Sequence, residues 1–181
     1  MNPSFTDVGI VIRLLDGGEA DKYATIVSQH HGLIDTLAKG VRRPKSRKSG
    51  HLDLLNLIKF QVARGRSPQI LTQVELINDF IHLKQDLHFS RSIFYLTEIL
   101  NHLLAHDQED EQLFLSLKNY LHKLNQLDYS PQSRQLSTDF QLYLLRHLGF
   151  PLPDKTSPRH LISHFEGIIN KRLKSKQIKL K

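Results

Sequence analysis

The spacing of apolar residues changes once along this chain of 181 residues, from a period of two to a period of about 3.6. In residues 58–63, IKFQVA, apolar and polar side chains alternate, which predicts a half-buried strand. From Asp79 onward, apolar residues recur every three or four positions, which is typical of amphipathic helices. The pattern predicts an α+β protein of two domains, with strands in residues 1–78 and helices in residues 79–181.

Five segments of the first domain have the composition of short strands, of which the first is a nearly continuous apolar run and the third alternates only in part. They are residues 8–15, 22–29, 33–39, 58–63 and 69–77. In the last segment we expect Ile70, Thr72, Val74 and Leu76 to share one face of the sheet, because successive side chains of a strand point to opposite sides. Five short strands in so few residues predict a small β-barrel, and the OB-fold is the five-stranded candidate.

The second domain shows two apolar stripes at helical spacing and two signals for a helix start. The stripes occupy residues 80–104 and about 109–127. The Ser-Pro pairs at 130–131 and 157–158 are typical of an N-cap followed by proline at the first helical position. Gly149 is a candidate helix stop. We expect a bundle of four or five helices.

The composition limits the function classes. The chain is 39% apolar, enough for a core, but it contains no stretch near the roughly 20 apolar residues of a membrane-spanning helix. Its start, MNPSFTDVG, lacks the charged and apolar regions of a secretory signal, so we expect a cytoplasmic protein. With no cysteine, disulfides, thiolate nucleophiles and Cys-ligated zinc are excluded.

The net charge of +7 is unevenly distributed along the chain. Residues 36–74 carry nine Lys and Arg against one Asp, and residues 155–181 carry eight against one Glu. Residues 1–35 and 75–154 are net acidic. A chain with two such cationic blocks suits a polyanionic partner.

The first cationic block centres on residues 38–52, AKGVRRPKSRKSGHL, which lack any carboxylate. A solvated charge run or an address signal is the simpler interpretation, but strands are expected on both sides, so we predict a loop of the barrel that contacts a phosphate backbone. The predicted contacts are Lys39, Arg42, Arg43, Lys45, Arg47 and Lys48, joined by Lys59, Arg64 and Arg66 from the next hairpin in one cationic groove.

Aromatic residues available for base stacking are few in the first domain. Residues 1–80 contain only Phe5, Tyr23, Phe60 and Phe80, and Phe60 lies on the apolar face of its strand. We therefore expect phosphate contacts to dominate, with steeply salt-dependent and largely sequence-independent binding.

The second cationic block lies at the end of the chain. Cations are ordinary partners of a helix C-terminus, but their number here exceeds what a helix end requires. We predict a second basic patch formed by Lys171, Arg172, Lys174 and Lys176.

No catalytic motif stands out. His102 and His106 have the i, i+4 spacing of helical metal ligands, but the segment reads HLLAH and lacks the glutamate of HExxH. His30 and His31 are adjacent, and on a strand they would point to opposite faces. Phosphate-cradling and dinucleotide-binding glycine motifs and a nucleophile elbow are absent from the sequence. We predict no catalytic residues, no metal and no cofactor.

Four segments resemble one known family. They are IVIRLLDGGEADKYATIVSQHHGLIDTLAKGVRRPKSR, HLDLLNLIKFQVARGRSPQILTQVELINDF, LLRHLGF and NKRLKSKQ, and the most specific of them is LAKGVRRPKSR followed by HL. Together they resemble the RecO recombination-mediator proteins of bacterial DNA repair. Many members carry a four-cysteine zinc module in the C-terminal domain, whereas this chain has no cysteine and resembles a short member.

The resemblance implies an N-terminal OB-fold, a helical C-terminal domain and a role in DNA recombination. Such proteins bind single- and double-stranded DNA, anneal complementary strands and help load RecA onto strands coated by single-strand DNA-binding protein. The implied partners are DNA, RecR and the acidic C-terminal tail of the single-strand DNA-binding protein, with RecA downstream. The implied DNA contacts are Lys39, Arg42, Arg43, Lys45, Arg47 and Lys48.

Two other functions fit parts of the sequence. An RNA- or ribosome-associated OB-fold protein would use the same cations. A metal-dependent enzyme such as a nuclease would use His102 and His106. A comparison of DNA binding with RNA binding would test the RNA-binding function. Incubation of DNA with the protein and a divalent metal would test the nuclease function.

Overall fold

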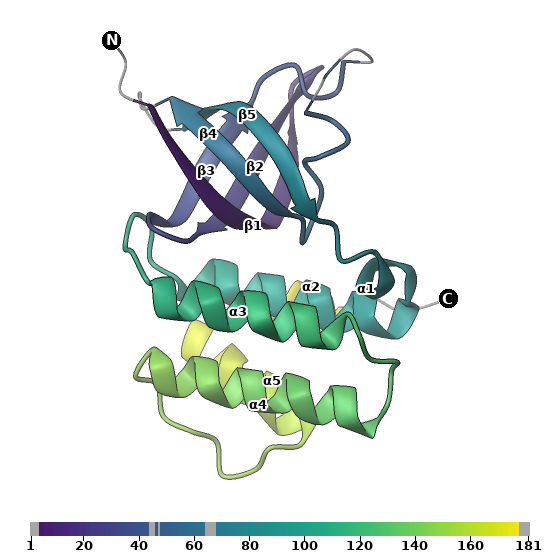
Figure 1. Cartoon of the computed structure of the whole chain (residues 1–181). Helices are drawn as coiled ribbons and strands as arrows, with labels where there is room; N and C mark the ends of the chain where they lie inside the picture. The colour runs from purple at the N-terminus through teal and green to yellow at the C-terminus, as the bar shows by residue number, and fades with distance from the viewer. Residues whose placement is uncertain (1–3, 44–45, 47, 64–67, 178–181) are drawn as a thin grey trace. The chain divides into compact units, whose positions relative to one another are not determined.

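The computed structural model of the chain describes residues 4–43, 46, 48–63 and 68–177. The described residues form five strands followed by five α-helices and one short 3-10 helix (Figure 1). They divide into two compact units. The first unit comprises residues 1–79 and 104–115, and the second comprises residues 80–103 and 116–181.

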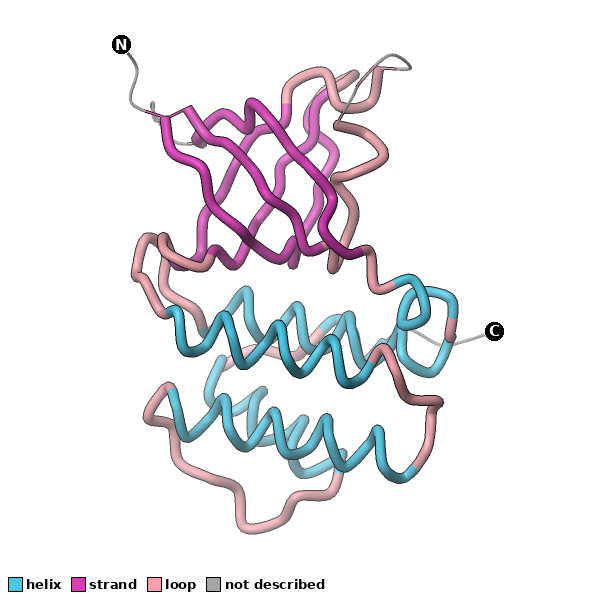
Figure 2. Tube along the Cα trace, viewed as in Figure 1, coloured by secondary structure: helices cyan, strands magenta, loops and turns pink. Residues whose placement is uncertain are grey.

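The strands of the first unit form a closed barrel (Figure 2). They are β1 Ser4–Gly17, β2 Asp21–Ser28, β3 Gly32–Ala38, β4 Leu57–Ala63 and β5 Gln69–Asn78. Their order around the barrel is β1-β2-β3-β5-β4. The expected five-stranded OB-fold barrel followed by helices is confirmed.

The long first strand and a short parallel seam close the barrel. Residues 9–17 of β1 pair with β2, while residues 4–10 pair with β4. The register with β2 shifts between Val11 and Arg13, a bulge that bends β1 between its two partners. The barrel closes where β3 meets β5 through only two paired positions, Thr36 with Gln69 and Leu37 with Ile70.

One expected strand face is wrong. Ile70, Thr72, Val74 and Leu76 do not share a side of β5, because the register with β4 shifts between Gln61 and Val62. This bulge turns Leu71 into the barrel core, leaves Thr72 exposed, and lets Val74 and Leu76 pack against the core.

The helices of the chain begin and end close to the sequence signals. They are α1 Ile81–Gln85, α2 Leu87–Leu103, α3 Glu111–Leu124, α4 Pro131–His147, α5 Pro158–Ile169 and the 3-10 helix η1 Lys174–Gln177. Ser130 forms a capping box with Ser133 at the start of α4. Ser157 precedes α5 without a side-chain cap bond. Gly149 follows the end of α4, as expected.

Aromatic contacts join the helices of the second unit. Tyr120 of α3 and Phe140 of α4 stack with ring centroids 4.4 Å apart. Tyr95 of α2 meets the buried Phe165 of α5 edge to face at 6.2 Å. Such ring pairs add to the hydrophobic stabilisation that comes from burying large side chains. No helix in the described part of the chain is long and apolar enough to cross a membrane.

The segment 104–115 belongs to the barrel unit although it follows α2 in the sequence. The backbone amide of Asp107 donates to the carbonyl of Leu33 on β3 at 3.1 Å. Gly32 has a φ of +67°, and a Cβ there would lie 2.0 Å from the backbone oxygen of Gln108. Only glycine fits this position, because it needs both the left-handed conformation and the close approach.

Candidate nucleic-acid interface

The cation-rich loop between β3 and β4 is anchored to the barrel. Val41 and Leu52 are buried within the barrel core. The amide of Leu55 donates to the carbonyl of Val11 at 2.7 Å, and the amide of Val11 donates to Asn56. Because the loop packs into the core at several points, its described cations are held against a rigid scaffold.

Three of the predicted phosphate contacts are exposed on this loop, namely Lys39, Arg42 and Arg43. The amide of Arg42 donates to the carbonyl of Ala20 at 2.9 Å, which fixes its backbone beside the β1–β2 turn. Its guanidinium lies 3.4 Å from Asp16, but both side chains are largely exposed, so this pair adds little stability. All three cations are accessible to solvent, and hence to an anion.

Lys48 has a different role. Its ammonium donates to the carbonyl of Leu71 on β5 at 3.0 Å. Partial burial lowers the pKa of Lys48, although the nearby Asp21 acts in the opposite direction. The ammonium therefore helps tie the loop to the barrel. The other predicted contacts of this region, Lys45, Arg47, Arg64 and Arg66, lie outside the described residues.

Lys59 lies on a strand of the barrel and not on the loop. It is exposed in β4, where it pairs with Val8 of β1 on one side and Glu75 of β5 on the other. Arg42 contacts Asp16, which is eight positions further along β1 than Val8, or roughly 25 Å along an extended strand. The single cationic groove expected from the sequence stays a prediction, because Arg64 and Arg66 lie outside the described residues.

Two exposed residues of the barrel were not among the predicted contacts. Arg13 and Tyr23 lie on the outer side of β1 and β2, and Tyr23 is 44% exposed. The sequence shows Tyr23 as one of few available rings, but its exposure depends on the barrel register. An exposed ring beside cations can stack on a base as well as accompany phosphate contacts.

A histidine pair meets one buried carboxylate at the β2–β3 turn. The ring Nδ1 atoms of His30 and His31 both lie 2.9 Å from oxygens of Asp7, whose side chain is 2% exposed. The hydroxyl of Ser28 and the amide of His30 also donate to this carboxylate. The expectation that the two histidines point apart is wrong, because they occupy the turn and not a strand.

The pKa values in this cluster follow from its hydrogen bonds. Burial alone would raise the pKa of Asp7, but bonds from His31, Ser28 and His30 outweigh it and lower the pKa to about 2. The bond to Asp7 raises the pKa of His30 in turn. The cluster thus ties the start of β1 to the β2–β3 turn through several hydrogen bonds to one carboxylate.

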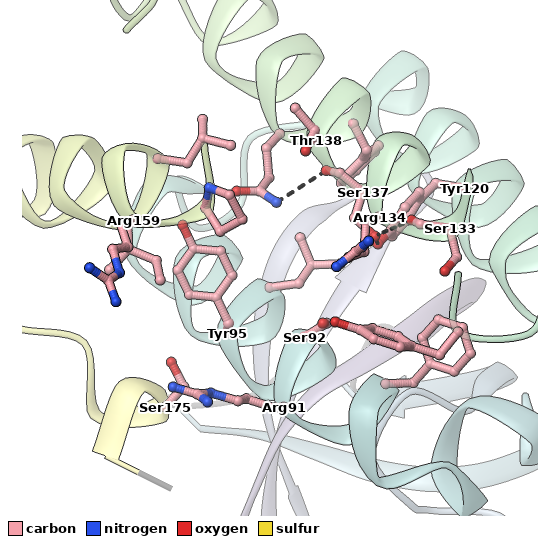
Figure 3. A pocket seen from close by; sticks show the side chains of 18 residues that line it. Arg91, Ser92, Tyr95, Tyr120, Ser133, Arg134, Ser137, Thr138, Arg159 and Ser175 are labelled. Atoms are coloured by element: carbon pink, nitrogen blue, oxygen red, sulfur yellow. Dashed lines mark hydrogen bonds between the residues drawn. The ribbon is translucent and has the colours of Figure 1, made fainter. Parts of the chain in front are cut away.

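The second unit contains a cavity of about 360 Å³ bordered by arginines. Arg91 of α2, Arg134 of α4 and Arg159 of α5 line it together with aromatic side chains, and Figure 3 shows them near the ring of Tyr95. Among the described residues, the Tyr95 hydroxyl and the Gln141 Oε1 are buried without a hydrogen-bond partner. A buried unsatisfied polar atom is costly, so both atoms are suited to a ligand. Burial, assisted by Glu166, raises the pKa of Tyr95 and keeps its phenol neutral.

The second predicted basic patch is anchored by a carboxylate. The backbone amides of Lys174 and Ser175 each donate to Glu98 of α2 at 2.9 Å. Burial alone would raise the pKa of Glu98, but these bonds outweigh burial and lower the pKa below its ordinary value. Lys171, Arg172 and Lys174 are exposed, while Lys176 contributes to η1. Their role in binding stays a prediction.

His102 and His106 do not lie on one helical face. Helix α2 ends at Leu103, so His106 is outside it. The Nε2 atom of His106 instead lies 3.0 Å from Asp35 on β3. In the described part of the chain, no group of three or more His, Asp or Glu side chains is placed to hold a metal ion.

Comparison with known proteins gives matches along most of the chain. Models of the N-terminal and C-terminal parts of recombination protein O match residues 1–80 and 84–153. A relative from Symbiobacterium thermophilum, named DNA repair protein RecO, is 34% identical over 142 residues, which are 78% of this chain and 55% of the relative. Relatives of the same name from Dehalococcoides mccartyi and Acetivibrio thermocellus are 30% and 32% identical, each over 56% of its own length.

These findings define the class and then the family. A closed five-stranded barrel with a cation-bearing loop, followed by helices, places the chain among two-domain OB-fold proteins. With both family models matching in order, the chain belongs to the RecO family of recombination proteins. It spans about half the length of the curated relatives that it matches.

Proposed function

We propose that this chain acts without catalysis in bacterial DNA repair and homologous recombination. It binds single- and double-stranded DNA, anneals complementary strands and helps to load RecA onto strands coated by single-strand DNA-binding protein. The observation that carries the DNA-binding part is the trio of exposed cations, Lys39, Arg42 and Arg43, on a loop packed into the barrel core. Family membership supports the role in repair.

The charges of the loop provide a physical reason for annealing. Two DNA strands repel each other through their phosphates, and a cationic surface that contacts both strands lowers this repulsion without reading the bases. Because Val41 and Leu52 hold the loop against the barrel, its cations need little ordering when a strand binds. The contacts then contribute to affinity with a small entropic cost.

The test is a triple substitution of Lys39, Arg42 and Arg43 by alanine. We expect annealing to be lost, and the slope of log K against log salt for a single strand to become shallower by about 2, since each phosphate contact contributes roughly 0.7. The matched control changes three exposed cations of the helical unit, Lys123, Arg146 and Lys155. The control variant should anneal at the wild-type rate. If the loop variant does so too, the assignment of the loop is wrong.

We assign the acidic tail of single-strand DNA-binding protein to the cavity of the helical unit. The three arginines at its border suit carboxylates, and its aromatic lining suits the apolar residues of a peptide. The Tyr95 hydroxyl offers a donor inside the cavity. Charge and shape therefore favour a short acidic peptide with an apolar end.

A pair of arginines on α4 provides a controlled test of this assignment. Arg134 lines the cavity, whereas Arg146 is exposed on the same helix outside the lining. We expect Arg134→Ala to weaken binding of a labelled tail peptide, measured by fluorescence anisotropy, and Arg146→Ala to leave it unchanged. Equal effects of the two substitutions would show only a general charge attraction.

The remaining partners in the proposal are RecR and, downstream, RecA, and both come from the family role. The competing RNA-binding function uses the same loop cations, so matched DNA and RNA oligonucleotides of one sequence must be compared. Tighter binding of RNA than DNA would favour that competing function. Intact DNA after long incubation with the protein and Mg²⁺ is expected, and cleavage would contradict a non-catalytic role.

A further inference from the structure

The outer side of β1, β2 and β3 carries an exposed aromatic ring between two aliphatic side chains. Tyr23 of β2 pairs directly with Leu15 of β1 and with Leu37 of β3. Tyr23 and Leu15 are 44% and 46% exposed, although large apolar side chains are more often buried. Neighbouring apolar side chains that stay exposed on adjacent strands offer a contact surface to a partner.

The next outward row on the same strands is polar. Arg13 pairs with Thr25, and Thr25 pairs with Asp35. The hydroxyl of Thr25 donates to one oxygen of Asp35 at 2.6 Å, and the other oxygen lies 3.0 Å from His106. These contacts hold the carboxylate in place and leave each of its oxygens able to accept another hydrogen bond.

The two rows border a shallow hollow of about 240 Å³. It is lined by Arg13, Leu15, Tyr23, Thr25, Asp35 and Pro68. The volume lies below the roughly 300–1,000 Å³ of sites for drug-sized ligands, so the hollow suits one small planar group.

The neighbouring strand leaves room for the tyrosine ring. A Cβ built on Gly17 would lie 2.8 Å from Cε2 and 3.0 Å from Cδ2 of Tyr23. The ring therefore extends across the end of β1, where only a glycine allows it to lie. A ring placed in this way supports a stacking partner without first changing its position.

The charges around the hollow distinguish a base from a phosphate. Asp35 within the lining repels a phosphate and accepts hydrogen bonds from exocyclic amino groups such as those of adenine and cytosine. Arg42 lies beside the β1–β2 turn that leads into β2, since its guanidinium contacts Gly18 and Asp16. The hollow thus carries one cation, Arg13, beside the carboxylate of Asp35, while Arg42 lies outside it. A hollow with balanced charge and a cation beyond its border suits a strand whose backbone passes by and whose base turns inward.

We propose that this hollow is a subsite for one unpaired base of a single DNA strand, stacked on Tyr23 with its edge toward Asp35. The inference rests on the proposed DNA binding and adds a contact that duplex DNA cannot make, since its bases are already stacked and paired. The proposal predicts that the protein distinguishes single-stranded from double-stranded DNA through Tyr23.

The absence of tryptophan from the sequence gives a direct test. Tyr23→Trp places a single indole in the hollow, and its fluorescence is followed while a short mixed-sequence oligodeoxynucleotide is added. We expect quenching that saturates together with the anisotropy of the labelled strand. Ile77→Trp, at an exposed position of β5, is the control and should not be quenched. Unchanged Tyr23→Trp fluorescence on a saturated protein would overturn the proposal.

A second pair of variants measures the contribution of the ring. Tyr23→Leu should weaken single-strand binding by roughly 5- to 150-fold, the range of one lost base stack, while Tyr23→Phe should keep it. Duplex binding should be unchanged in both variants. Single-strand binding by Tyr23→Leu equal to wild type would mean that the hollow serves another partner. A wild-type protein that binds no DNA would refute the proposed function itself.

Discussion

The carboxylate of Asp7 offers the sharpest prediction about stability, because the groups that donate hydrogen bonds to it are defined in the structure. It is buried at the start of β1 and accepts hydrogen bonds from Ser28, His30 and His31. Asp7→Asn keeps the shape but removes the charge, and it places an amide NH₂ among groups that donate. We expect the free energy of unfolding of the barrel unit to fall by about 3 kcal/mol near pH 5 to 6, the loss for charge-assisted bonds to a buried group.

The pH dependence of this loss follows from the pKa values. The pKa of Asp7 falls from an ordinary 3.8 to about 2, which corresponds to about 2 kcal/mol of stability that is present above pH 4 and is lost as the pH falls toward 2. The raised pKa of His30 adds stability that is complete below pH 6.5 and is lost as the pH rises through its folded-state pKa. The cluster is therefore most stabilising between about pH 4 and 6.5.

Urea unfolding at a series of pH values, followed by the NMR signals of barrel amides, measures this effect. The difference between wild type and Asp7→Asn should shrink from about 3 to about 1 kcal/mol between pH 5 and 2. The control is Asp16→Asn, an exposed aspartate of the same strand, which should change stability by less than about 0.5 kcal/mol. A difference that stays constant or grows toward pH 2 would refute the assigned role of the carboxylate.

Five further substitutions, two of them controls, test three local features of the fold by thermal or urea unfolding. Gly32→Ala should cost about 3 kcal/mol or more, because the new Cβ meets backbone as well as an unfavourable φ; Gly18→Ala, with a φ of +63° in open space, should cost about 1 kcal/mol. Ser130→Ala should cost about 1 kcal/mol through loss of the capping box, whereas Ser157→Ala should cost a few tenths. Tyr120→Phe should cost about 1 kcal/mol, because the ring stays packed while its bond to Ser137 is lost.

The sequence predicted the elements of this fold well because both periods were regular. Continuous or alternating apolar runs bounded by turn residues located the strands, and the Ser-Pro pairs located the starts of α4 and α5. The face of β5 was wrong because a bulge adds one residue on one strand and reverses the side of every residue beyond it. A single sequence carries no clear signal for such a bulge when both neighbours are apolar or small, as Leu71 and Thr72 are.

The candidate site was predicted less completely, since it depends on contacts between distant residues. The basic loop was recognisable from composition, but the use of Lys48 by the barrel and the distance of Lys59 from Arg42 follow from packing and register. The exposure of Tyr23 is likewise a property of the assembled barrel. The boundary between the domains after residue 78 stays a prediction.

The membership of residues 104–115 in the barrel unit imposes an order on folding during synthesis. All five strands have been made once the ribosome passes Asn78, but the contact of Leu33 with Asp107 has to wait until the helical residues 81–103 have also emerged. Until then, the carbonyl of Leu33 on β3 lacks the amide of Asp107 as its partner and is open to other chains. The barrel unit therefore completes its contacts only after part of the helical unit has been synthesised. A ribosome that pauses within α2 would leave both units incomplete.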